Sequence, residues 1–257
     1  MEPIESPKRR RRGIYLLPNL FTTGTLFGGF YAIVAAQQGR FEPACIAIFI
    51  AMIADSLDGF IARKTHTSSE FGKEYDSLCD MVAFGVAAAM VMYSWSLHYF
   101  SEYHWLGGKL GWVIAFTYTA CAALRLARFN VLASRGEAKG NFFGLPSPGA
   151  AAVVFGFVWA ADATDLDPHV MLVPAAVVTL GAALLMVSNI RFFSLKSLKL
   201  TERVPFRYML AVIGLLALFA NDPPRIFFLV FFAYAAGGPA VALYSRIRKN
   251  PASQPAP

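Results

Sequence analysis

Apolar runs long enough to cross a lipid bilayer recur along almost all of this chain of 257 residues. Hydrophobic residues make up 56% of the sequence and charged residues only 15%, a balance that a soluble domain of this length seldom has. We therefore predict an all-α integral membrane protein. The apolar runs place about eight transmembrane helices, over residues 15–36, 41–63, 74–98, 107–127, 148–162, 168–189, 206–220 and 225–246.

Two neighbouring spans contain four aspartates, Asp55 and Asp58 in the second and Asp76 and Asp80 in the third. Carboxylates at membrane depth are costly, so they usually mark an ion, proton or substrate site. Helical periodicity places the first pair on one helix face and stacks the second pair on one face of the next helix. Opposed across a helical hairpin, these faces would gather four carboxylates around one or two divalent cations.

Residues 55–80 follow the pattern D-x-x-D-G-x-x-A-R, eight further residues, and then G-x-x-x-D-x-x-x-D. This pattern resembles the signature of the CDP-alcohol phosphatidyltransferase family, and every specified residue and spacer matches. Segments 18–22, 125–130 and 144–148 are similar to the phosphatidylserine synthase branch of that family. Thr25 departs from the branch, which commonly has asparagine there.

The resemblance implies transfer of the phosphatidyl group from CDP-diacylglycerol to the hydroxyl of L-serine, with release of CMP. It assigns Asp55, Asp58, Asp76 and Asp80 to a metal site, and Asp80 is also the expected general base for the serine hydroxyl. Hard oxygen ligands suit Mg²⁺ or Mn²⁺, which would stabilise charge on the phosphoryl group.

Further residues of the resembling segments are expected to bind the two substrates. Small side chains in the signature would let the nucleotide approach the backbone, although they could equally serve helix packing. The residues expected to bind CDP-diacylglycerol are Asn19, Thr22, Asp58, Gly59, Ala62, Arg63 and Gly72. The serine carboxylate needs a cation, and a guanidinium offers two parallel donors. The candidates for serine are Arg125, Arg128 and Asn130, whose alternative role is to stabilise a helix end.

Lysines and arginines are distributed unevenly between the predicted loops. Nineteen lie in the segments on the side of the N-terminus, and three, Arg40, Lys109 and Arg225, lie in the loops on the other side. The positive-inside rule therefore predicts a cytoplasmic N-terminus in a bacterial-type inner membrane. Asp55 lies eight residues before Arg63, about 12 Å along a helix. The predicted site is thus a polar metal-binding cavity that opens to the cytoplasm.

The sequence divides into a basic cytoplasmic segment, residues 1–14, a polytopic membrane catalytic domain, residues 15–246, and a disordered tail, residues 247–257. Segment 191–207 has the pattern of an interfacial amphipathic helix or of an ordinary basic loop. The net charge of +7 does not indicate nucleic acid, because the basic residues flank apolar spans. The three cysteines, Cys45, Cys79 and Cys121, fall in apolar stretches and are expected to be buried thiols.

Membrane lipids are expected partners, and the family resemblance also implies a homodimer. Two alternative functions stay open at the level of sequence. A sister enzyme of the family would use glycerol 3-phosphate, inositol phosphate or choline as its acceptor, since all members share the aspartates. A cation- or proton-coupled transporter could also use intramembrane acids, but it would have little need for the fixed glycine, alanine and arginine.

Overall fold

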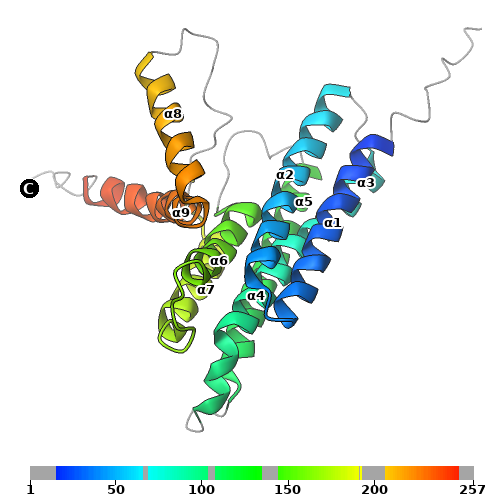
Figure 1. Ribbon diagram of the computed structural model, residues 1–257. Helices are drawn as coiled ribbons and strands as arrows, with labels where there is room; N and C mark the ends of the chain where they lie inside the picture. Colours follow the sequence, from blue (N-terminus) through cyan, green and yellow to red (C-terminus); the bar gives the residue numbers. More distant parts are fainter. Residues whose placement is uncertain are drawn as a thin grey trace, which may run out of the picture.

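The computed structural model describes residues 16–65, 69–103, 108–134, 144–190, 192 and 206–248, and within these ranges it contains helices and no strands (Figure 1). The predicted all-α class is therefore confirmed. The helices are α1 (Leu16–Gln37), α2 (Phe41–Thr65), α3 (Glu70–Asp80), η2 (Met81–Ala87), α4 (Ala88–Trp95), η3 (Leu97–Glu102), α5 (Leu110–Ser134), α6 (Ser147–Asp162), α7 (Leu172–Val187), α8 (Phe206–Asn221) and α9 (Pro223–Arg248). The predicted N-terminal basic segment, almost all of 191–207 and the tail after Arg248 lie outside the described residues.

Five of the helical segments are long and apolar enough to cross a membrane: Asn19–Gln37, Phe41–Ile61, Glu70–Trp95, Leu110–Ser134 and Pro223–Ala242. Two shorter apolar helices, Ser147–Asp162 and Leu172–Val187, correspond to the predicted fifth and sixth spans. Helix α5 continues seven residues beyond the predicted end at 127, so that Arg128 and Asn130 belong to it. Propensity explains this extension, because most residues between Leu126 and Ser134 are compatible with a helix.

Small residues allow α1 to approach its neighbours closely. A Cβ atom on Gly28 would lie 2.9 Å from the Ala47 carbonyl oxygen in α2, and one on Gly29 would lie 2.6 Å from Cα of Ala83 in η2. Ala32 and Ala51 on these faces are fully buried. Close backbone approach of this kind is how helices pack in lipid, where apolar side chains gain little by leaving the solvent.

Helices α3, η2 and α4 form one continuous helical segment from Glu70 to Trp95. Its middle, from Met81 to Ala87, is π-helical and begins directly after Asp80. A π-helical stretch changes the angular offset of the residues on either side, and such stretches are frequent at functional sites. The carboxylates of α3 are therefore oriented independently of the apolar face of α4, which packs in the core.

Side-chain contacts bring several helix ends together at one end of the bundle. Thr23 in α1 lies 3.0 Å from the Tyr75 hydroxyl in α3, and Arg128 in α5 donates to Asn189, which follows α7. At the opposite end, Ser96 donates to the carbonyl of Pro168. In Figure 1 the turn between α1 and α2 and the connection between α6 and α7, both predicted on the outside, lie toward the lower end of the molecule, whereas the turn between α8 and α9, predicted on the same side, lies higher.

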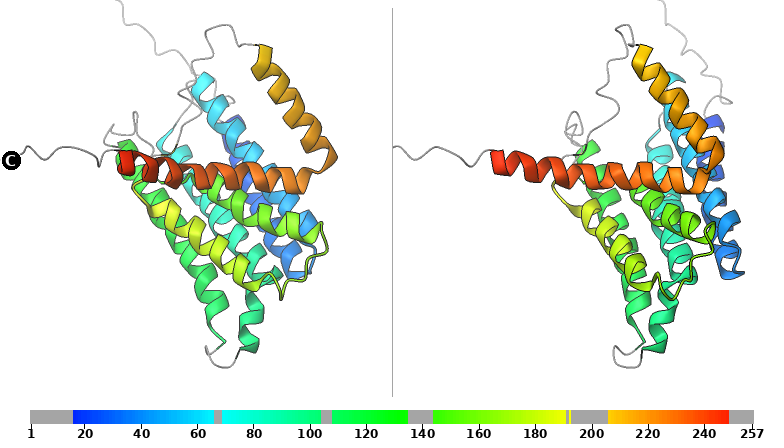
Figure 2. Two further views of the ribbon diagram at one scale, coloured as in Figure 1. Left: turned by 90° about the vertical axis from the view of Figure 1, so that its left-hand side faces the viewer. Right: turned by 60° about the vertical axis from the view of Figure 1, so that its left-hand side comes forward.

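Helix α9 packs along α6 in the opposite direction. Gly149 near the start of α6 faces Tyr234, whereas Gly156, about two turns later, faces Phe227. Figure 2 shows α9 at a steep angle to α1 and α2, with α8 leading away from the other helices. The end of α8 still approaches α2, because the rings of Phe219 and Phe49 lie 6.4 Å apart.

Candidate metal and substrate site

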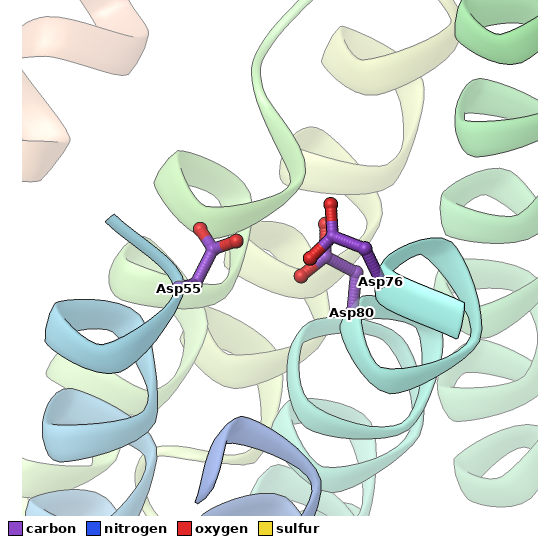
Figure 3. Close-up of side chains that lie close together, drawn as sticks. All are labelled: Asp55, Asp76 and Asp80. Carbon is purple, nitrogen blue, oxygen red and sulfur yellow. The ribbon is translucent and has the colours of Figure 1, made fainter. Parts of the chain in front are cut away.

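Three of the four predicted carboxylates meet between α2 and α3. Asp55 projects from α2 toward Asp76 and Asp80, which project from successive turns of α3 (Figure 3). One carboxylate oxygen from each lies within 4.8 Å of the other two. Three acids from two helices are thus grouped, whereas helical periodicity predicted that all four aspartates would be gathered on the two opposed faces.

The start of α3 is fixed by its own sequence. Ser69 is the N-cap residue, in an extended conformation, and its hydroxyl oxygen accepts a hydrogen bond of 2.9 Å from the amide of Gly72. This cap satisfies one of the amides that the first turn of a helix leaves unpaired. Asp76 and Asp80 follow one and two turns later, four residues apart, so both carboxylates point to the side of α2.

Asp80 provides the clearest sign that a cation belongs here. Its Oδ1 atom is buried and accepts a hydrogen bond from none of the residues that the structure describes. A buried carboxylate oxygen without a donor is unfavourable unless a positive charge compensates it. Three carboxylates and their hard oxygen atoms form a donor set that fits Mg²⁺ or Mn²⁺.

Asp58 does not belong to this group of three. Its side chain is 5% exposed, and its Oδ2 atom accepts a hydrogen bond of 2.8 Å from the Thr22 hydroxyl of α1. It lies one turn of α2 after Asp55 and is close enough to Asp76 to interact with it electrostatically. Thr22 and Asp58, both expected to bind CDP-diacylglycerol, therefore contact each other directly between α1 and α2.

The residues predicted for nucleotide binding surround the same end of α3. A Cβ atom on Gly72 would lie 3.6 Å from Asn19 Oδ1 and 3.1 Å from the Ser69 hydroxyl, so a larger side chain would crowd both groups. Gly59 is partly exposed on α2, one residue after Asp58. Ala62 and Arg63 lie in the last turns of α2, and their side chains are outside the described part of the chain.

Arg125 joins the two segments that resemble the serine-specific branch. It lies in α5, and its Nη1 atom donates a hydrogen bond to the hydroxyl of Ser147, the fully buried first residue of α6. Its Nε atom is buried and has no acceptor among the described residues. Arg125 also interacts electrostatically with Asp80, which connects it to the carboxylate group.

The other two predicted serine-binding residues have protein partners. Arg128 Nη2 donates a hydrogen bond of 2.9 Å to Asn189 Oδ1 on the exposed side of α5. Asn130 Nδ2 lies 2.9 Å from the hydroxyl of Ser77 in α3, and that hydroxyl lies 3.3 Å from Asn130 Oδ1. Asn130 therefore connects α5 to the residue directly after Asp76.

Sequence reasoning did not identify three residues that contact or lie near the predicted site residues. Ser77 follows Asp76 in the signature, but serine in a helix is too common to signal a contact. Asn189 and Tyr234 come from segments that show little beyond hydrophobicity, so no sequence pattern could have found them. Thr25, which departs from the resemblance, is 1% exposed and its hydroxyl lies 3.3 Å from the Ala51 carbonyl oxygen. Thr25 therefore makes a hydrogen bond between α1 and α2, although the resembling branch commonly has asparagine at this position.

All three cysteines are free thiols; Cys45 and Cys79 are buried, as predicted, whereas Cys121 is only partly buried. Cys45 donates a weak hydrogen bond to the carbonyl of Phe155, at 3.4 Å. Cys79 lies beside the carboxylates but is not part of the candidate metal group, whose members among the described residues are all aspartates.

Comparison with known proteins gives consistent matches. The family model described as CDP-alcohol phosphatidyltransferase matches residues 15–187. The chain is 36% identical over 192 residues to the CDP-diacylglycerol–serine O-phosphatidyltransferase of Helicobacter pylori, an alignment covering 72% of this chain and 75% of that protein. It is 34% identical over 178 residues to the archaetidylserine synthase of Methanothermobacter thermautotrophicus, covering 68% and 69%. A protein of Bacillus subtilis with the same name as the first is 33% identical over 178 residues, covering 68% and 89%.

Proposed function

The chain belongs to the CDP-alcohol phosphatidyltransferase family, and from this premise we propose that it transfers the phosphatidyl group of CDP-diacylglycerol to the hydroxyl of L-serine. The serine oxygen forms a bond to the phosphorus that carries diacylglycerol. The bond from that phosphorus to the oxygen bridging the two phosphates breaks, and CMP leaves. The hydroxyl proton passes to a base, for which Asp80 is our candidate.

The observation that carries this proposal is the convergence of Asp55, Asp76 and Asp80, with a buried oxygen of Asp80 lacking a donor among the described residues. A divalent cation held by these carboxylates would stabilise charge on the pyrophosphate and on the leaving CMP. Asp58, held by Thr22, is the fourth carboxylate of the proposed site. Asn19 and Gly72 lie next to the proposed site, where the nucleotide would bind. We assign Gly59, Ala62 and Arg63 to CDP-diacylglycerol binding as well.

Serine as the acceptor has two sources of support. The names of the bacterial relatives contain serine, and the archaeal relative is named for a serine lipid. Arg125 also provides a partly buried guanidinium, near enough to Asp80 to interact with it electrostatically, and a carboxylate-bearing acceptor requires such a cation. Arg128 is a secondary candidate for the same carboxylate. We propose that Asn130, given its contact with Ser77, acts on the acceptor only indirectly.

The chain is a membrane protein by its five apolar helices and its family. We propose eight membrane spans in the bacterial-type inner membrane, with the N-terminus and the carboxylate cavity facing the cytoplasm. The charge count supports this orientation. We also propose a homodimer. Small residues such as Gly28 can allow helices of two chains to pack closely, but Gly28 already packs against α2 of its own chain. We therefore expect other residues to form the contact between the two chains.

One assay tests the function. Purified protein is incubated with CDP-diacylglycerol, Mn²⁺ or Mg²⁺, and one of L-serine, glycerol 3-phosphate, inositol phosphate or choline, and CMP release is measured. We expect release with L-serine, dependent on the cation. Release only with another acceptor would identify a sister enzyme. Absence of release with all acceptors, together with cation uptake into vesicles containing the protein, would favour a transporter.

A further inference from the structure

Helix α9 places a tyrosine beside the candidate acceptor site, although α9 lies outside the residues that match the family model. The ring of Tyr234 lies over the start of α6, where a Cβ atom on Gly149 would be 3.6 Å from its Cε1 atom. On another side, the ring of Phe192 lies 5.8 Å from it. Tyr234 is thus positioned by packing from two segments, and its ring is only partly exposed.

Arg125 lies at the same end of α6 as Tyr234. It donates through Nη1 to Ser147, two residues before Gly149, against which the Tyr234 ring packs, and its buried Nε has no acceptor among the described residues. Arg125 is near enough to both Tyr234 and Asp80 to interact with them electrostatically. The amides at the start of α6 add a partial positive charge near the same place. This region is therefore suited to an anionic group that lies near the carboxylate centre.

We propose that the Tyr234 hydroxyl and the Arg125 guanidinium together bind the carboxylate of the acceptor, so that α9 determines acceptor selectivity. The proposal rests on the proposed function, since it concerns the acceptor of that reaction. A carboxylate has two oxygens and accepts from two donors at once. With the carboxylate held at Arg125, the short serine side chain would direct its hydroxyl toward Asp80.

The place of Tyr234 in the chain fits a role in selectivity. The aspartates that act on the shared CDP-alcohol donor lie inside the family-matched region, residues 15–187. Arg125 also lies inside that region, and α9 adds a contact from outside it that can differ between members with different acceptors. Buried donors shaped for a carboxylate discriminate strongly against an acceptor that lacks it, because they are then left unpaired.

The test is steady-state kinetics of CMP release by the full-length Tyr234→Phe variant. We expect the KM for L-serine to rise about tenfold, as for loss of one hydrogen bond to a charged group, and the KM for CDP-diacylglycerol to stay within about twofold. With ethanolamine as the acceptor, which lacks the carboxylate, the substitution should change the kinetics of CMP release only slightly. Tyr244→Phe is the matched control, because Tyr244 lies on the same helix and is 66% exposed.

A second variant separates binding from packing. Tyr234→His keeps a ring with a hydrogen-bond donor but fits the packing less well than phenylalanine does. If the hydroxyl binds the acceptor, the histidine variant should have a serine KM closer to that of the wild type than the phenylalanine variant has. An unchanged serine KM in Tyr234→Phe, or a larger loss with histidine than with phenylalanine, would overturn the proposal. A wild type that releases no CMP with L-serine would instead refute the proposed function.

Discussion

At the scale of single residues, the most important feature is the group of carboxylates formed by Asp55, Asp76 and Asp80. Three like charges with oxygens within 4.8 Å repel one another strongly in a partly buried site. Without a cation, this repulsion opposes folding, and with a cation the same charges attract it. Substituting one of these carboxylates should therefore reduce turnover strongly, yet it should not lower the stability of the metal-free protein.

Asp76→Asn tests this expectation. We expect CMP release to fall at least about 100-fold, because a ligand of the cation is lost. The thermal midpoint without Mn²⁺ should be unchanged or higher, because one of three repelling charges is gone, and the stabilisation by Mn²⁺ should shrink. The matched control is Asp165→Asn on an exposed turn, where asparagine tolerates the positive φ of 50°. Activity near the wild-type level in Asp76→Asn would refute the metal site.

Arg125 and Arg128 provide a comparison of two arginines on one helix. Arg125→Lys keeps the charge but loses the planar set of donors, so the KM for L-serine should rise strongly while that for CDP-diacylglycerol changes little. Arg128→Lys should have the smaller effect, because Arg128 is exposed and donates to Asn189. Kinetics with both substrates distinguish this pattern from a helix-end role, which would lower the thermal midpoint and affect both substrates alike.

At the scale of helices, one polar contact between α5 and α3 lies directly beside the carboxylates. Asn130 and Ser77 form the polar link between these helices, directly beside Asp76. The π-helical stretch after Asp80 lets α3 keep this orientation while α4 packs in the core. Loss of the link should therefore alter the metal site more than the acceptor site.

Asn130→Ala measures this effect. The Mn²⁺ concentration for half-maximal activity should rise roughly threefold to tenfold, less than for a direct partner of a metal ligand. Ser77→Ala should give a similar rise, and the double variant should be no worse than either single one, because both remove the same contact. Ser134→Ala, near the exposed end of α5, is the control. A higher serine KM with unchanged Mn²⁺ dependence would place Asn130 at the acceptor instead.

The turn before α6 depends on one glycine. Gly144 has a φ of 81°, its amide donates to the Ile190 carbonyl, and a Cβ atom there would lie 2.3 Å from the Met186 carbonyl oxygen. Gly144→Ala should destabilise the protein by at least about 1–2 kcal/mol, seen as a lower thermal midpoint in detergent. Gly181→Ala in α7 is the contrast, since no described atom would approach its Cβ within 4 Å. It should be neutral or stabilising by about 0.5–1 kcal/mol.

At the scale of the whole molecule, the two ends of the bundle have different characters. One end gathers the carboxylates, Arg125 and the start of α6. The other end holds aromatic contacts, such as that between the rings of Tyr99 and His169, whose centroids lie 3.6 Å apart, and His169 Nδ1 lies 3.8 Å from a Glu102 carboxylate oxygen. The carboxylate end is also the end near which most lysines and arginines occur in the sequence.

Orientation can be measured without reference to catalysis. In a background lacking Cys45, Cys79 and Cys121, single cysteines replacing Glu70 and Asp165 are exposed to a membrane-impermeant thiol reagent in intact cells. The charge distribution predicts protection at 70 and labelling at 165. Labelling at 70 only after the membrane is permeabilised is the control for accessibility. Labelling at 70 in intact cells would place the carboxylate site outside.

The sequence alone predicted the helical class, most of the apolar spans and the four aspartates with their family. These properties are local, because helical period, hydrophobicity and a spaced motif each depend on residues close together in the chain. Only the tertiary structure distinguished Asp58, bound to Thr22, from the group of three acids. It also paired Arg125 with Ser147 and Asn130 with Ser77, and it brought Tyr234 from α9 to the site. Such contacts join residues far apart in the sequence, and they depend on how the small residues of each helix pack against the next.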